Sequence, residues 1–82
     1  MVMYEAGMLA RSKAGHDKAQ MYIIKEVDDT YVYLVDGRIR KLGHPKKKKK
    51  KHVQIVHGIY NMKELDDAGI RKLIKDWMKE EK

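Results

Sequence analysis

The residues of this chain whose types and spacing could do chemistry are basic. Nine lysines and arginines, and no acidic residue, lie between Arg38 and His52. The 82-residue chain has a formal net charge of +7, and residues 1–60, with thirteen basic and six acidic residues, carry all of it. Residues 61–82 hold six of each kind and are neutral. Because solubility alone does not require clustered charge, this pattern favours a polyanionic partner and contacts to phosphate groups.

The densest part of this cluster is the run of six lysines, Lys46–Lys51. Like charges in series repel one another, so we expect the run to form a solvated, mobile loop. Such a loop would condense onto a nucleic-acid backbone and displace counterions without reading sequence. Arg38 and Arg40 are two residues apart on an expected strand, so their guanidinium groups would leave the same face and fork onto phosphates. For the lysine run the alternative is a solubility tail. For Arg38 and Arg40 the alternative is a solvated strand face.

A second basic segment surrounds a glycine. Lys13 and Lys18, with His16 between them, would present positive charge and a ring N–H to phosphates. Gly15 has no Cβ, so it can take a positive φ and let backbone amides approach an anion closely. An ordinary solvated turn is the alternative for this loop.

Tyrosines offer a second kind of contact. Tyr22, Tyr31 and Tyr33 are candidates for stacking on unpaired bases, as on other β surfaces that bind RNA. Tyrosines in such strands more often lie in the core or at a barrel rim with the hydroxyl in water. Trp77 is a candidate contact to a protein partner, although packing in the core is the commoner role for a residue of its kind.

The sequence speaks against an enzyme. It has no cysteine, its only serine is Ser12, and it lacks a Gly-rich phosphate loop. His44, His52 and His57 fit no common metal-ligand spacing. We therefore expect no catalytic residue, metal, cofactor or small-molecule substrate. The apolar stretches are too short to span a membrane, no signal-peptide pattern opens the chain, and a cytoplasmic protein is expected.

Alternating and β-branched residues predict five short strands, at residues 8–12, 20–25, 31–35, 38–42 and 52–57. Asp36-Gly37 is the preferred two-residue hairpin turn between the third and fourth of them. Short antiparallel strands must hide their edges, so the expected fold is mainly β, a small five-stranded barrel. Residues 1–60 would form this barrel, with a lysine-rich loop at 43–51.

The period changes after Gly58, and residues 61–82 are expected to be helical and to pack on the barrel. Asn61 and Glu64 have the spacing of a capping box, and Asp66 or Asp67 could cap a longer second helix. Five apolar residues then follow at helical spacing and form one stripe, which we expect to pack over an open end of the barrel: Ile70, Leu73, Ile74, Trp77 and Met78.

Several of these features occur together in one known motif. Gly7 opens the first strand, residues 12–18 form a basic loop around a glycine, residues 21–25 alternate, and a hydrophobic run ends in Val35-Asp36-Gly37. Residues 9–37 resemble a KOW motif, the RNA-binding signature of several ribosomal proteins and transcription elongation factors. The family usually has a second glycine where this chain has Ala19. The whole chain is similar to small bacterial KOW proteins, which in turn resemble a large-subunit ribosomal protein of archaea and eukaryotes.

The resemblance implies an SH3-like barrel that touches RNA through its first loop, and it makes ribosomal RNA of the large subunit the expected partner, with ribosomal proteins as further contacts. The expected stacking residues are Tyr22 and Tyr33. The expected RNA-binding residues are Arg11, Lys13, Gly15, His16, Lys18, Arg38, Arg40, Lys41, Lys46, Lys47, Lys48, Lys49, Lys50 and Lys51.

Two other functions fit the same sequence. An SH3-like protein-interaction module at a transcription or translation complex would use the stripe around Trp77. A nonspecific polyanion or nucleoid binder would treat RNA, DNA and heparin alike.

Overall fold

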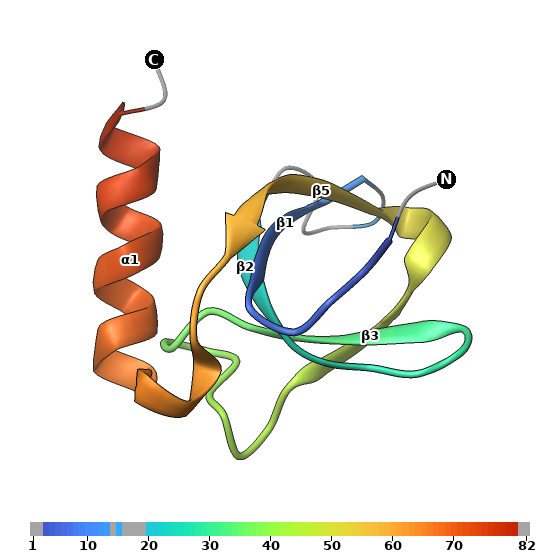
Figure 1. The fold of residues 1–82 in the computed structure, drawn as a ribbon, viewed down its shortest axis with the longest axis horizontal. Coiled ribbons are helices and arrows are strands. Elements are labelled where there is room, and N and C mark those ends of the chain that lie inside the picture. The colour runs from blue at the N-terminus through green and yellow to red at the C-terminus, as the bar shows by residue number, and fades with distance from the viewer. Residues whose placement is uncertain (1–2, 14, 16–19, 81–82) are drawn as a thin grey trace.

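The chain folds into a curled sheet of five antiparallel strands with one helix beside it (Figure 1). The computed structural model describes residues 3–13, 15 and 20–80. The sheet order is β4-β3-β2-β1-β5, and every pairing between neighbours is antiparallel. The strands are β1 (Met8–Ser12), β2 (Met21–Val27), β3 (Tyr31–Val35), β4 (Lys46–Lys49) and β5 (Val53–Ile59). The predicted mainly β, five-stranded SH3-like barrel with a C-terminal helix is confirmed.

Within the described residues, three helical segments accompany the sheet: two 3-10 turns, η1 (Lys50–His52) and η2 (Met62–Glu64), and the helix α1 (Asp67–Glu80). Asn61 accepts a hydrogen bond at Oδ1 from the Lys63 amide at 3.0 Å, and this cap begins η2 rather than a longer helix. Asp66 accepts at Oδ1 from the Gly69 amide at 2.7 Å and so caps α1. Of the two aspartates proposed as this cap, Asp66 has the role.

In β1, in β2 and at the end of β3, alternate side chains enter two different cores. One set fills the inside of the curled sheet: Ala10, Tyr22, Ile24, Val32, Leu34 and Val53. The other set lies on the opposite side of β1–β3, where Leu9, Met21, Ile23 and Val35 pack against Ile70 and Ile74 of α1. Burying a large apolar side chain contributes about 1.5–3 kcal/mol, so these two clusters dominate the stability of the fold.

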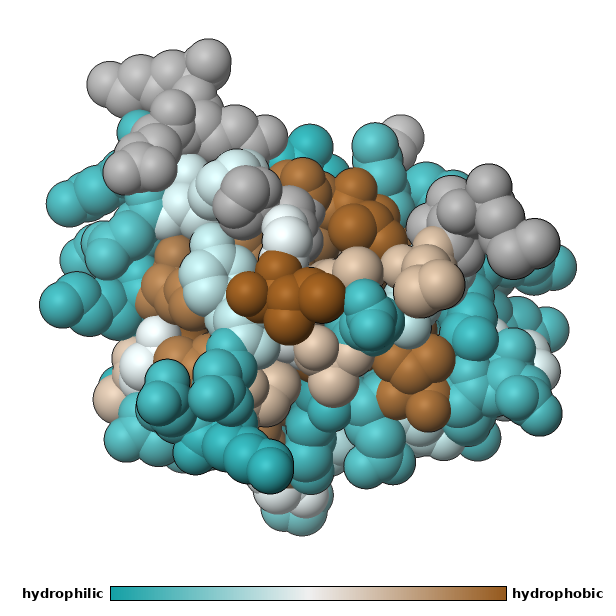
Figure 2. Space-filling view, viewed as in Figure 1, coloured by the Kyte–Doolittle hydropathy of each residue, from teal (hydrophilic) through white to brown (hydrophobic). Residues whose placement is uncertain are grey.

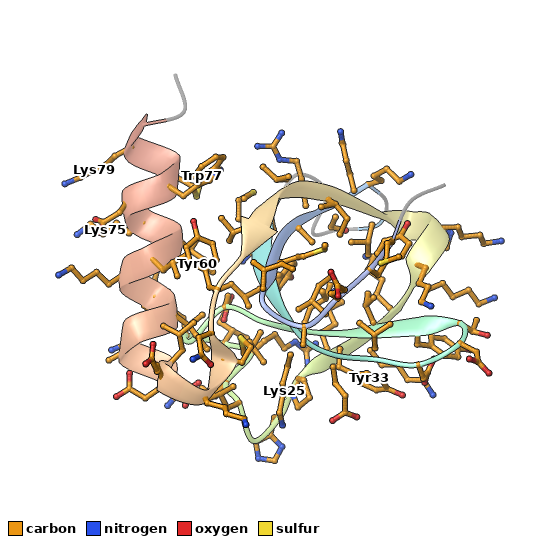
Figure 3. All side chains as sticks on the ribbon, viewed as in Figure 1. Lys25, Tyr33, Tyr60, Lys75, Trp77 and Lys79 are labelled. Atoms are coloured by element: carbon orange, nitrogen blue, oxygen red, sulfur yellow. The ribbon has the colours of Figure 1, made fainter. Side chains whose placement is uncertain are left out.

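Most of the apolar stripe of α1 packs on the barrel, as expected, but it lies on the outer side of the sheet and not over an open end. Leu73 and Trp77 are partly buried against the cluster that contains Ile70 and Ile74. Met78 differs, because it is 53% exposed. Figure 3 shows Trp77 directed toward the barrel, while Lys75 and Lys79 project from the other side of the helix.

The prediction of a strand at 38–42 is wrong, and the Asp36 side chain explains why. Its Oδ1 accepts hydrogen bonds from the amides of Arg38 and Arg40, both at 2.9 Å. The Asp36 amide donates to the Arg40 carbonyl at 2.9 Å, which closes the segment into a compact turn. The Leu42 amide donates to Asp67 Oδ1 at 2.8 Å, so it too is committed elsewhere. These amides cannot pair with β3.

The prediction of a mobile lysine loop is also wrong, because Lys46–Lys49 form β4 and take the free edge of β3. Successive side chains of a strand point to opposite faces, so lysines on one face are about 7 Å apart and repel each other less. The apolar stems of lysines can lie along a sheet while the ammonium groups stay in water. Strand pairing is therefore compatible with a run of this charge.

In the part of the chain that the structure describes, no helix is long and apolar enough to cross a membrane.

Candidate nucleic-acid interface

The pairing of β3 with β4 brings tyrosines and lysines together. In this register Tyr31 lies opposite Lys49, and Tyr33 lies opposite Lys47. Val32 and Leu34, which alternate with the two tyrosines, are fully buried inside the barrel. Tyr31, Tyr33, Lys47 and Lys49 therefore share the outer side of the sheet. We call these four residues the tyrosine–lysine face.

The members of this face are accessible and in contact. Lys47 and Lys49 are exposed, and both tyrosines are half-buried. The Lys47 Nζ lies 4.2 Å from the centre of the Tyr31 ring, a cation–π contact. Figure 3 shows Tyr33 on β3, at the side of the molecule away from α1. Aromatic rings beside cations on an open sheet can stack on bases and neutralise phosphates at the same time.

An acidic residue borders the face. Asp28 accepts hydrogen bonds at Oδ1 from the amides of Tyr31, at 2.6 Å, and Thr30, at 2.9 Å. Its Oδ2 accepts from the Tyr33 hydroxyl at 2.8 Å. These bonds, with the Tyr31 amide first, lower the pKa of the Asp28 carboxyl, and Lys47 lowers it further. The same carboxylate raises the pKa of the Tyr33 hydroxyl. Asp28 therefore holds Tyr33 in place on the face.

The rest of the lysine run continues from the face around the corner of the barrel. Lys50 lies in η1, where its amide donates to the Thr30 carbonyl at 3.0 Å and its Nζ donates to the Asp29 carbonyl at 3.2 Å. Lys51, also in η1, is exposed. Lys46 and Lys48 are half-buried and alternate with the two lysines of the face. The six lysines thus follow one edge of the barrel.

The glycine loop is described only in part. Gly15 has a φ of 86°, which confirms the prediction of a positive φ at this position. Lys13 is exposed, and its amide donates to the His52 carbonyl at 2.8 Å, so the start of the loop lies next to the end of η1. Arg11, on β1, is half-buried. His16 and Lys18 lie outside the described residues.

Three other predicted site residues do not join the tyrosine–lysine face. Arg38 and Arg40 lie in the turn closed by Asp36, so the prediction that they share one strand face is wrong. Arg38 and Lys41 are exposed, whereas Arg40 is half-buried. Arg38 instead lines a groove beside α1.

Tyr22 cannot stack on a base in this structure, so its prediction as a stacking residue is wrong. Its side chain is 3% exposed and belongs to the cluster inside the barrel. The physical reason is that β2 is buried on both sides, with Met21 and Ile23 against α1. Tyr31 belongs to the face in its place, and the alternation of Tyr31 and Tyr33 along β3 is the sequence signal for it.

Sequence reasoning missed one group of cations. Arg71, Lys72, Lys75 and Lys79 line the same groove as Arg38, although residues 61–82 are neutral as a whole. Among the described residues, no group of histidines and acidic side chains could hold a metal ion.

No protein-family model matches this chain, and a search of curated proteins also finds no match.

Proposed function

We propose that the chain is an RNA-binding module without catalytic activity. The observation that carries this proposal is the β3–β4 register, which sets Lys47 and Lys49 opposite two tyrosines on an accessible sheet surface. Basic side chains supply sequence-independent attraction to the phosphate backbone, and rings between them supply stacking for unpaired bases. A plain solubility device would need the charge but not the rings.

Two further features support RNA as the partner. The remaining lysines of the run extend the positive surface along the same edge, and Lys13 lies beside it. Stacking platforms suit RNA with unpaired bases, because bases in a duplex are already stacked on each other. The resemblance to KOW proteins makes ribosomal RNA of the large subunit the specific partner in this proposal.

The test is binding of the full chain to a labelled RNA hairpin with an unpaired loop, compared with a DNA duplex and with heparin, over a range of salt. We expect a preference for the hairpin. Replacing both face lysines, in Lys47→Gln with Lys49→Gln, should reduce the slope of log K against log salt by about 1.5, since each phosphate contact contributes about 0.7 to 0.9.

The single variants Lys47→Gln and Lys63→Gln form a matched pair, because both remove one positive charge from an exposed side chain. Only the first should weaken binding to the hairpin. Equal binding to RNA, DNA and heparin would overturn the proposal in favour of a nonspecific polyanion binder. Sedimentation of a tagged chain with the large ribosomal subunit, lost in the Lys47 and Lys49 variant, tests the ribosomal partner.

A further inference from the structure

A second basic surface lies on α1, away from the tyrosine–lysine face. A groove of about 990 Å³ runs between α1 and the turn at 36–40. Five cations line it: Arg38, Arg71, Lys72, Lys75 and Lys79. All five are exposed, and none of them makes an ion pair with another described residue. We call this feature the helix groove.

The charged side chains that line the helix groove are mostly cationic, although more of its accessible lining is apolar than polar. Met21 and Ile74 belong to its lining, but they are only 2% and 9% exposed because they serve the core. Met78 is the exposed large apolar side chain that remains. Five cations and one exposed large apolar side chain favour an anion over an apolar partner helix, which would need several exposed anchor positions.

The Asp36 carboxylate, which lines the groove, already accepts hydrogen bonds from other groups of the protein. Asp36 is 6% exposed, its Oδ1 accepts from two backbone amides, and its Oδ2 accepts from Gln20 Nε2 at 3.3 Å. Arg71 is anchored as well, because its Nη1 donates to the Gly37 carbonyl at 2.8 Å. Lys72, Lys75 and Lys79 have no such bond to another described residue, so they are available to a ligand.

The spacing of these lysines suits a repeating anion. Lys72, Lys75 and Lys79 are three and four residues apart, so they form one row along α1 that is about 10 Å long. In double-stranded DNA each strand carries one phosphate per about 3.4 Å of the helix axis, so the length of this row is comparable to a short stretch of nucleic-acid backbone. Asp76 borders this row on the helix, next to Lys72 and Lys79 in the helical arrangement.

The two basic surfaces lie at different sides of the barrel. Figure 1 shows α1 at one side and the turn between β2 and β3 at the other, and Figure 2 shows hydrophilic side chains over both ends with apolar ones between them. We propose that the helix groove binds a second segment of RNA backbone, so that one copy of the chain bridges two RNA segments. This inference rests on the proposed function for its first contact.

The experiment uses the full chain and one short RNA hairpin, labelled in one sample with a donor dye and in another with an acceptor. With protein limiting, the wild-type chain should bind two hairpins and produce energy transfer between the dyes. Analytical ultracentrifugation should find one protein and two hairpins in that complex. Two protein copies in it would overturn the inference, because each copy would then need only one surface.

Two triple variants remove the same charge from the two surfaces: K72Q/K75Q/K79Q and K47Q/K49Q/K51Q. Each variant should still bind one hairpin and should lose energy transfer. The slope of log K against log salt for total hairpin binding should fall by about 2 to 3 relative to the wild-type chain. Glutamine is a good helix former, and circular dichroism checks that each variant is folded. Asp76→Asn should instead tighten binding a few-fold, a gain that misfolding cannot produce.

The outcomes separate this inference from the proposed function. If the wild-type chain binds only one hairpin and the helix variant keeps its affinity and salt slope, the helix groove is not a site and the proposed function stands. If the helix variant loses binding while the lysine-run variant keeps it, the tyrosine–lysine face is not the site and the groove remains.

Discussion

Arg71 donates a hydrogen bond from Nη1 to the carbonyl oxygen of Gly37 at 2.8 Å, and so joins α1 to the turn that follows β3. The same two segments meet a second time, because the Leu42 amide donates to Asp67 Oδ1 at 2.8 Å. Gly37 has a φ of 77°, and a Cβ at this position would collide with the Asp67 carbonyl oxygen. The turn at 36–40 and the first turn of α1 are therefore built as one unit.

Replacing Gly37 by alanine should lower the free energy of unfolding by at least about 2 kcal/mol. The left-handed conformation alone costs a residue with a Cβ about 1–2 kcal/mol, and the collision with the helix backbone adds to this. Urea denaturation followed by circular dichroism measures the change in the free energy of unfolding.

Gly43→Ala is the matched control for this measurement. A Cβ at Gly43 has no atom within 4 Å and its φ is not in the left-handed region, so the expected change is within about 1 kcal/mol. Equal effects of the two substitutions would contradict the close contact between Gly37 and α1.

The Asp28 carboxyl should titrate below the usual range of an aspartate. The amides of Tyr31 and Thr30 and the Tyr33 hydroxyl all favour its charged form and lower its pKa. A lowered pKa in the folded state means that Asp28 stabilises the fold above its unfolded pKa, and that this contribution is lost as the pH falls through the folded pKa. NMR titration of the carboxyl carbon measures this pKa.

Tyr33→Phe gives the control for Asp28. It removes one hydrogen bond and leaves the larger contributions of the two amides, so the pKa of Asp28 should rise but stay below the ordinary value. An Asp28 that titrates at the ordinary value in the wild-type chain would contradict the contacts around it.

The sequence predicts the elements whose signals are local. Tyr31–Val35 alternates clearly and forms β3, and the aspartate before the last apolar stripe caps α1. The fourth strand is misplaced because its position depends on contacts between distant residues. Asp67 accepts a hydrogen bond from the amide of Leu42, which is 25 residues away in the sequence. The edge of β3 pairs instead with Lys46–Lys49, a segment without any apolar alternation.

In the candidate site too, the features with local signals are visible in the sequence, and those that depend on distant contacts are not. The lysine run is visible as charge, but its pairing with two tyrosines depends on a register that no local pattern contains. The helix groove is hidden in the sequence because residues 61–82 have no net charge. Folding sorts Lys72, Lys75 and Lys79 to one side of α1, and only then does the basic surface exist.

Hydrogen exchange tests whether the lysine run is a strand. Because β4 pairs with β3 along one edge only, alternate amides of Lys46–Lys49 should exchange slowly and the others fast. Uniformly fast exchange across the four residues would instead indicate the mobile loop that their charge suggests. NMR at near-neutral pH resolves the four amides individually.

The rings of Tyr31 and Tyr33 should matter for RNA through their faces rather than their hydroxyls. Tyr31→Leu should weaken binding to single-stranded RNA by roughly 5- to 150-fold, since stacking one base on an aromatic side chain contributes about 1–3 kcal/mol. Tyr31→Phe keeps the ring and should bind like the wild-type chain. Anisotropy titrations with single-stranded and fully paired RNA measure both variants, and the loss in Tyr31→Leu should be confined to the single strand. Equal losses in the two variants, or none in Tyr31→Leu, would remove stacking from the proposal and leave the contacts of Lys47 and Lys49 to phosphates as the basis of binding.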